Sequence, residues 1–197
     1  MPAVPFTTPY DPDRWIHVPL DYVDSPWADA GEWAAWVADA ALRDREGGEA
    51  VRDAVREEAL SVALFPAEHV SFRFWHYPND AEPSGFADIF VQAREDDGTS
   101  PADLLPELAM TAVTPALTDV EAAGQRAAVR RLSLGVVARP GTDGEPMLVP
   151  KAEYLGVTAG WVTYVLSVDF DVNALEGRLD DLDALFAGIE FASATAS

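Results

Sequence analysis

The stretch HVSFRFWHY, residues 69–77, indicates a β-strand because its large apolar residues recur with a period of two. Alternate side chains of a strand point to opposite faces of the sheet. One face therefore carries Val70, Phe72 and Phe74, and His76 is in phase with them. The other face carries a different set of side chains, namely Ser71, Arg73, Trp75 and Tyr77. We predict a strand whose two faces carry these two sets of side chains.

Further strands follow this one along the chain. The segment FADIFVQAR, residues 86–94, alternates in the same way, and the turn-rich PNDAEPSG before it predicts an antiparallel hairpin. Residues 117–139 contain a strand-like run, a break near Gly124 and a longer strand. Two more alternating strands are predicted at 147–157 and 160–170. The segment RWIHVPLDYV, residues 14–23, predicts an earlier strand at a sheet edge, because it contains a proline.

Helical spacing appears before and after these strands. A helix is predicted from Asp29, with apolar residues at helical intervals: Trp33, Trp36, Val37, Ala40 and Ala41. A second helix carries Val51, Val55, Ala59 and Val62, and a last one carries Leu175, Leu179, Leu182, Leu185 and Phe186. A further helix is predicted in ADLLPELAMTAV, residues 102–113, with Pro106 where its regular part begins.

We therefore predict an α+β domain with an antiparallel sheet of about five to six strands, N-terminal helices and a C-terminal helix packed on it. Residues 1–13 contain four prolines and no periodic pattern, so we expect an extended proline-rich arm. Residues 14–197 form a single domain, because a chain of 197 residues is typical of one core.

In element order the chain resembles the PsbP-like α+β fold of small, functionally unassigned bacterial proteins. Three segments carry the resemblance: WIHVPLDY at 15–22, the strand pair within 147–170, and LDDLDALFAGIEF at 179–191. The resemblance implies an antiparallel sheet between helical layers and a non-catalytic binding or accessory role.

The charge of the chain is strongly acidic. Asp and Glu number 34 against 13 Lys and Arg, a net charge of -21, and Lys151 is the only lysine. Such a surface repels nucleic-acid phosphates and anionic membranes, so we expect neither as a partner. The charge keeps the chain in solution or attracts a basic partner, and both interpretations stay open. No signal peptide and no apolar run of about 18 residues is seen, so we expect a cytoplasmic protein.

The three histidines are His17, His69 and His76. We favour His76 as a packed ring at the end of a sheet face over a general base oriented by Asp80 or Asp88. His69 and His76 fall on opposite strand faces, so we expect no metal site from them. Cysteine is absent, which excludes disulfides, thiolate metal sites and cysteine nucleophiles.

The segment DFDVNALEGRLD, residues 169–180, matches a calcium-binding loop in part. Ala174 stands where such a loop needs glycine, so we predict instead a helix capped by Asp171 or Asn173. Glycine-rich phosphate-binding motifs are absent, and we expect no cofactor and no metal.

Four of the six tryptophans lie in the first forty residues: Trp15, Trp27, Trp33 and Trp36. We expect most of them in the core, and Trp27 or Trp15 as the anchor for a partner if either is exposed. The sequence as a whole predicts a non-enzymatic protein-binding or accessory domain that engages a protein partner or itself. The alternative is a small-molecule-binding protein or hydrolase with a site near Trp75, His76 and Tyr77.

Overall fold

The computed structural model describes residues 6–42, 48–79, 82–95, 97–139, 141 and 144–191. Its helices are α1 (Ala30–Ala41), α2 (Glu49–Leu64), α3 (Pro101–Leu104), α4 (Val172–Gly177) and α5 (Leu179–Ala187). The strands of the main sheet are β2 (Trp15–Val18), β3 (Phe72–His76), β4 (Phe86–Ala93), β5 (Ala116–Asp119), β6 (Ala127–Ala138), β7 (Pro146–Val157) and β8 (Trp161–Val168). A separate two-stranded sheet pairs β1 (Phe6–Thr7) with β9 (Glu190–Phe191).

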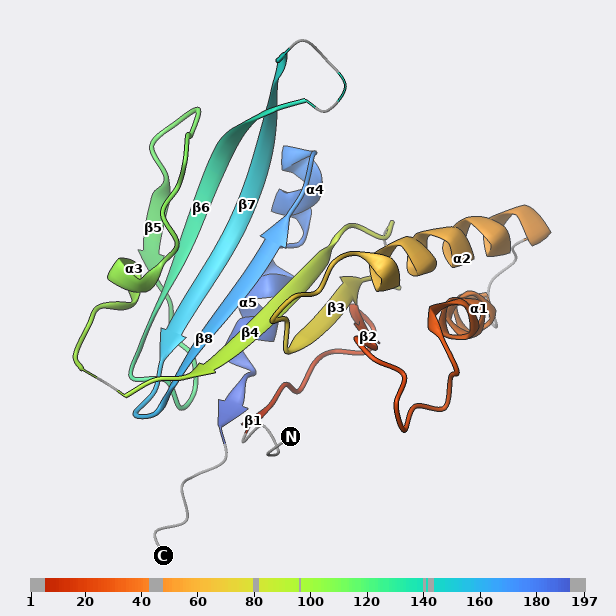
Figure 1. Ribbon diagram of the computed structural model, residues 1–197, viewed down its shortest axis with the longest axis horizontal. Coiled ribbons are helices and arrows are strands. Elements are labelled where there is room, and N and C mark those ends of the chain that lie inside the picture. The colour runs from red at the N-terminus through yellow and green to blue at the C-terminus, as the bar shows by residue number, and fades with distance from the viewer. Residues whose placement is uncertain are drawn as a thin grey trace, which may run out of the picture.

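The main sheet has seven strands in the order β2-β3-β4-β8-β7-β6-β5, and all neighbours run antiparallel. The helix pair α1 and α2 lies at the β2–β3 end of the sheet, and α5 lies behind the sheet in Figure 1. The strands β2 and β5 are the two edges. The molecule is therefore an α+β structure, as the sequence predicts.

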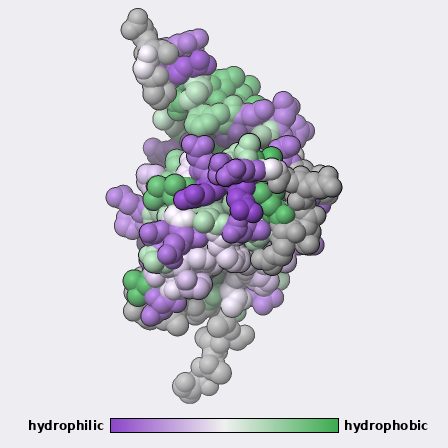
Figure 2. Space-filling view, turned by 90° about the vertical axis from the view of Figure 1, so that its right-hand side faces the viewer, coloured by the Kyte–Doolittle hydropathy of each residue, from purple (hydrophilic) through white to green (hydrophobic). Residues whose placement is uncertain are grey.

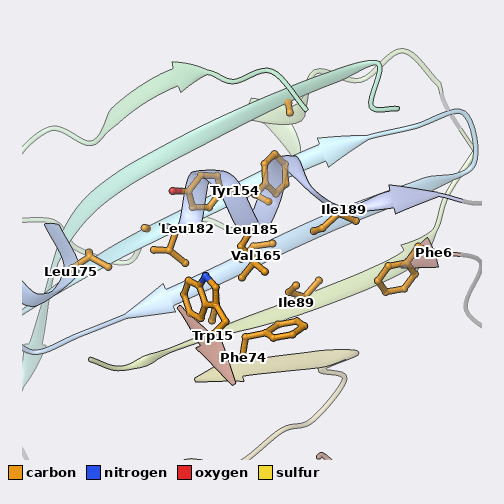
Figure 3. Packing of buried hydrophobic residues seen from close by; sticks show 14 residues of the cluster. Phe6, Trp15, Phe74, Ile89, Tyr154, Val165, Leu175, Leu182, Leu185 and Ile189 are labelled. Carbon is orange, nitrogen blue, oxygen red and sulfur yellow. The ribbon is translucent and has the colours of Figure 1, made fainter. Parts of the chain in front are cut away.

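Two buried clusters cover the two faces of the β2–β4 part of the sheet. The first cluster, the α5-side core, joins the sheet to α4 and α5 and includes Phe6, Trp15, Phe74, Ile89, Tyr154, Val165, Leu182 and Phe186 (Figure 3). The second cluster, the helix-pair core, joins β2 and β3 to α1 and α2 and includes Val18, Trp33, Val37, Val55, Ala59, Val62, Trp75 and Tyr77. Consecutive residues of β3 thus enter different cores, which confirms the predicted alternation at Phe74 and Trp75.

Two details of the predicted architecture are wrong. The main sheet has seven strands instead of five or six, and the helices do not lie only at the two ends of the chain, because α3 falls between β4 and β5. The predicted helix at 102–113 stops at Leu104. Leu105 precedes Pro106 and adopts an extended conformation with ψ of 140°, as steric contact with a following proline ring requires.

Aspartate side chains cap two of the helices. Asp29 caps α1 by accepting a hydrogen bond from the Glu32 backbone N–H. Asp171 caps α4 by accepting from the Asn173 backbone N–H at 2.8 Å, which confirms the cap in the segment at 169–180. The C-terminal helix predicted as one element is divided at Arg178 into α4 and α5.

The described part of the proline-rich arm contacts the domain through Phe6. This ring is buried in the α5-side core, and it lies 5.2 Å from the Phe72 ring. Residues 1–5 of the arm lie outside the described residues. None of the helices in the described chain is long and apolar enough to cross a membrane.

Candidate functional site

The edge strand β2 presents backbone groups that the sheet does not use. Its register pairs Ile16 with Trp75 and Val18 with Arg73, and the Tyr77 N–H donates to the Arg14 carbonyl. In an antiparallel ladder, alternate residues bond to the neighbouring strand, so residues 14, 16 and 18 face β3. The backbone N–H and C=O of His17 therefore point away from the sheet, to the free edge.

A hollow of about 640 Å³ opens along this edge. It lies between the β2 residues, the start of the chain and the exposed side of α1, with Tyr77 and Asn79 at one end. Its lining residues are Tyr10, Pro12, Trp15, Ile16, His17, Trp27, Trp36, Val37, Ala40, Ala41, Tyr77 and Asn79. We call this hollow the β2 groove. Its volume lies in the range of about 300–1,000 Å³ that is usual for ligand sites.

A second hollow of about 300 Å³ continues from the β2 groove. The two share His17 and Trp27, and the second is also lined by Pro19, Leu20, Asp21, Ser25, Ser71 and Phe72. Figure 2 shows this end of the molecule, where patches of hydrophobic residues are bordered by hydrophilic ones. The two hollows together follow the β2 edge over its whole length.

Aromatic rings dominate the β2 groove. The Trp36 side chain is 48% exposed and its ring centroid lies 5.1 Å from that of Trp27. Tyr10 is 40% exposed and lies 4.9 Å from the Phe74 ring. Each of these exposed rings is thus in contact with another ring.

Charge at the groove is negative. Asp11 and Asp13 flank the lining residue Pro12, and Asp13 accepts a hydrogen bond from Asn79 Nδ2 at 2.8 Å. Within the part of the chain that the structure describes, neither carboxylate has a salt bridge to a basic side chain. Among the described residues that line the groove, none is a lysine or an arginine, and desolvation lowers the pKa of His17.

The structure separates the residues that the sequence predicts as a site. Trp27 and Tyr77 line the β2 groove, as a binding role requires. Trp75 is fully buried in the helix-pair core, where its ring lies 4.9 Å from that of Tyr77. His76 points to the opposite face of β3 and packs against the Trp15 ring at 4.8 Å. Neighbouring residues of a strand cannot share one site on one face.

His76 is nevertheless hydrogen-bonded at both ring nitrogens. Its Nε2 lies 2.9 Å from Asp181 Oδ2, and its Nδ1 lies 2.8 Å from Ser84 Oγ. A carboxylate only accepts, so Nε2 carries the proton and Nδ1 accepts from the Ser84 hydroxyl. Burial lowers the pKa of His76, and the charges of Arg178 and Arg14 act in the same direction, while Asp181 opposes them.

The partners proposed for His76 from the sequence were different. Asp88 binds Arg73 instead, and Asp80 lies outside the described residues. Ser84, His76 and Asp181 stand in the order of a catalytic triad, but with the two ring nitrogens exchanged. The His76 residue is only 4% exposed, and neither it nor Ser84 lines the β2 groove.

The described residues contain no cluster of three or more metal-ligating side chains. In the segment that partly matches a calcium loop, Asp169 binds the buried Arg178 and Asp171 caps α4. Both carboxylates thus have structural partners of their own.

Two groove residues, Trp36 and Tyr10, were not singled out as a site from the sequence. Trp36 has the spacing of the buried helix face, but it lies at the border of that face, next to the fully buried Trp33 and Val37. Tyr10 lies in a proline-rich segment without periodicity. The one available signal was the density of aromatic residues in the first forty positions.

Comparison with models of protein families found no family that matches this sequence, and comparison with curated proteins found no match. The site must therefore be interpreted from its own geometry.

Proposed function

We propose that this chain is a non-enzymatic protein-binding domain that takes up an extended segment of a partner along the free edge of β2. The observation that carries the proposal is the β2 groove, which lies beside an edge strand with an outward-facing backbone. A segment that adds to an edge strand gains main-chain hydrogen bonds, and its alternate side chains enter pockets.

The dimensions of the site agree with this mode of binding. Successive side chains of an extended segment on one face lie about 6.6 Å apart, twice the rise per residue of about 3.3 Å. The two hollows along β2 meet at His17 and Trp27, so side chains of one segment can occupy both. The resemblance to the PsbP-like fold implies an accessory role, and such a domain is compatible with that role. We propose that the domain acts in the cytoplasm.

The experiment starts from a displayed library of random twelve-residue peptides, from which binders of the wild-type chain are selected. In His17→Pro the N–H that faces the free edge is removed, whereas the bonds from Ile16 and Val18 to β3 are kept. We expect selected peptides to bind His17→Pro at least tenfold more weakly, as measured by calorimetry. His17→Ala separates the loss of the side chain from the loss of the N–H.

The matched control is Leu117→Pro at the opposite edge. Val120 N–H donates to the Ala128 carbonyl, so the N–H of Leu117 in β5 also faces outward. Both proline variants should unfold at nearly the wild-type temperature, and only His17→Pro should lose the peptides. If the library yields no binder, or if its binders bind His17→Pro as well as wild type, the proposal is wrong.

Self-association through the same edge is tested with the same variants. If a second copy of the chain is the occupant, sedimentation equilibrium should show a wild-type dimer that His17→Pro reduces to a monomer.

The second candidate function is a hydrolase or small-molecule-binding protein near His76, favoured by the Ser84–His76–Asp181 arrangement. In that case Ser84 would be the nucleophile, and its proton would pass to His76 Nδ1. Reaction of Ser84 with a fluorophosphonate probe, absent in Ser84→Ala, would support it. The near-complete burial of His76 makes us favour the protein-binding function.

A further inference from the structure

The β2 groove is rich in aromatic side chains. Five of its lining side chains are aromatic, namely Tyr10, Trp15, Trp27, Trp36 and Tyr77. The faces of aromatic rings carry negative electrostatic potential and attract cations. Of these five, Trp36 and Tyr10 are the exposed rings, so they are the ones that a cation in the groove can reach.

The charges around the groove favour the same class of ligand. Asp11 and Asp13 are the chain neighbours of the lining residue Pro12, and Asp13 accepts a hydrogen bond from the lining residue Asn79. Neither carboxylate has a salt bridge to a described arginine or lysine. Asp39, next to the lining residue Ala40, is paired with Arg52 at 3.4 Å, so its charge is already compensated. A cation in the groove would bring the missing partner for the first two carboxylates, in a chain of net charge -21.

We propose that the segment bound at β2 inserts an arginine side chain into the β2 groove, between the rings and the carboxylates of Asp11 and Asp13. This inference rests on the protein-binding function proposed above. A guanidinium group is planar, so it stacks on a tryptophan face and also donates hydrogen bonds in its own plane to a carboxylate. An ammonium group is a point charge and stacks less well.

Within the described residues, a buried arginine already lies between aromatic rings and a carboxylate. The Arg73 guanidinium carbon lies 4.5 Å from the Phe86 ring centroid and 5.4 Å from that of Phe65, while its nitrogens bind Asp88. A guanidinium between aromatic rings and a carboxylate is thus an arrangement that this fold accommodates. The β2 groove has aromatic rings with carboxylates nearby at the surface, and a partner would supply the arginine.

The test uses three blocked seven-residue peptides of alternating valine and threonine with arginine, lysine or citrulline at the centre. Citrulline has nearly the shape of arginine but no charge. We expect the arginine peptide to bind about tenfold more tightly than the citrulline peptide, with lysine between them. Calorimetry is done at 0.1 M and 0.5 M NaCl, because long-range attraction by the net charge is screened at higher salt while a contact in the groove persists.

Three variants locate the preference. Trp36→Leu should remove most of the arginine–citrulline difference, and Trp36→Phe should keep part of it, because a phenyl ring retains a π face. Asp13→Asn should weaken the arginine peptide and leave the citrulline peptide unchanged. Phe170→Leu is the control, an exposed aromatic residue outside the groove lining, and should change nothing.

The outcomes separate the two proposals. If arginine and citrulline peptides bind equally well and both lose affinity in His17→Pro, edge binding stands and the arginine inference is wrong. If the arginine preference survives in Trp36→Leu and Asp13→Asn, the preference comes from the overall charge and the inference is wrong as well. If no central residue gives binding and the library also yields no binder, both proposals fail.

Discussion

The two ends of the sheet are built with the same contact. At the β2 end, Arg73 on β3 is paired in register with Asp88 on β4, with bonds of 2.6 and 2.9 Å to the carboxylate. At the β5 end, Arg131 on β6 is paired in register with Glu153 on β7, with two bonds of 2.8 Å. Both arginines are buried. Both lie on the face of the sheet that α1, α2 and α3 cover.

The two arginines donate hydrogen bonds to the backbone of different segments. Arg73 also donates to the carbonyls of Val62, Phe65 and Pro66, which end the sixteen-residue helix α2. Arg131 donates to one carbonyl, that of Pro106, in the segment after the four-residue helix α3. A long helix pair therefore covers one end of the sheet, and a short loop covers the other.

The consequence appears at the two edges. The pair α1 and α2 extends beyond β2 (Figure 1). Residues of α1 form one wall of the β2 groove. All four residues of β5 are exposed, and Pro115 and Asp119 mark the ends of this strand in the way that blunts an edge against pairing. The hollow of about 640 Å³ thus lies at the edge that α1 walls, whereas a smaller hollow of about 350 Å³ borders Ala116 at the β5 end.

The largest expected effect comes from breaking the two arginine contacts. Arg73→Met leaves Asp88 buried without its partner and frees the end of α2, so we expect a loss of about 4 kcal/mol. Arg131→Met should cost less, about 2 kcal/mol, because Glu153 still accepts a hydrogen bond from the Tyr164 hydroxyl. Urea unfolding followed by tryptophan fluorescence measures both. A larger loss in Arg131→Met would contradict the comparison.

A glycine at each end offers a second test. Gly85 has φ of +51°, and a Cβ there would lie 2.8 Å from Arg178 Nη2, which is buried and cannot move away. We expect Gly85→Ala to cost about 3 kcal/mol, from backbone strain and overpacking together. Gly124 at the β5–β6 turn has φ of +74° and open space around it, so Gly124→Ala should cost only about 1 kcal/mol. Equal losses in thermal unfolding would mean that Arg178 yields to the added methyl group.

The smallest effect concerns pH. All three histidines precede β4, and burial lowers the pKa of His76 below its unfolded value of about 6.5. Below pH 6.5 the unfolded chain therefore binds more protons than the folded one, and stability falls as pH is lowered. His76→Gln should cost about 1 kcal/mol at pH 7.5 and reduce this fall.

Burial also lowers the pKa of His17, so the comparison between His76→Gln and wild type, not the wild-type curve alone, isolates His76. Burial raises the pKa of Asp88 and Glu58, and these two shifts increase stability as the pH is lowered.

Hydrogen exchange at pH 5.5 should show loss of protection in β2 and β3 before β6 and β7. Identical pH profiles for wild type and His76→Gln would contradict the expectation.

Much of the fold could be predicted from local pattern. The alternation at 69–77 placed Phe74 and Trp75 on opposite faces, and Asp171 was one of the two residues predicted to cap the helix that follows residue 171. The prediction failed where a local pattern met a backbone restriction, as at Leu105, whose conformation is set by the proline after it. It also failed in the number of strands, although the strand-like run that begins at residue 117 overlaps β5.

The sequence by itself determined the acidic charge, the absence of cysteine, the α+β class and the two-faced character of β3. These follow from composition and from side-chain periods that a single segment contains. Only the tertiary structure decided that His76 meets Asp181 across 105 positions, and that Tyr10, Trp27, Trp36 and Tyr77 surround one hollow. The physical reason is that periodicity tells which side of a segment is buried, whereas its neighbours are chosen by packing and strand pairing among distant parts of the chain.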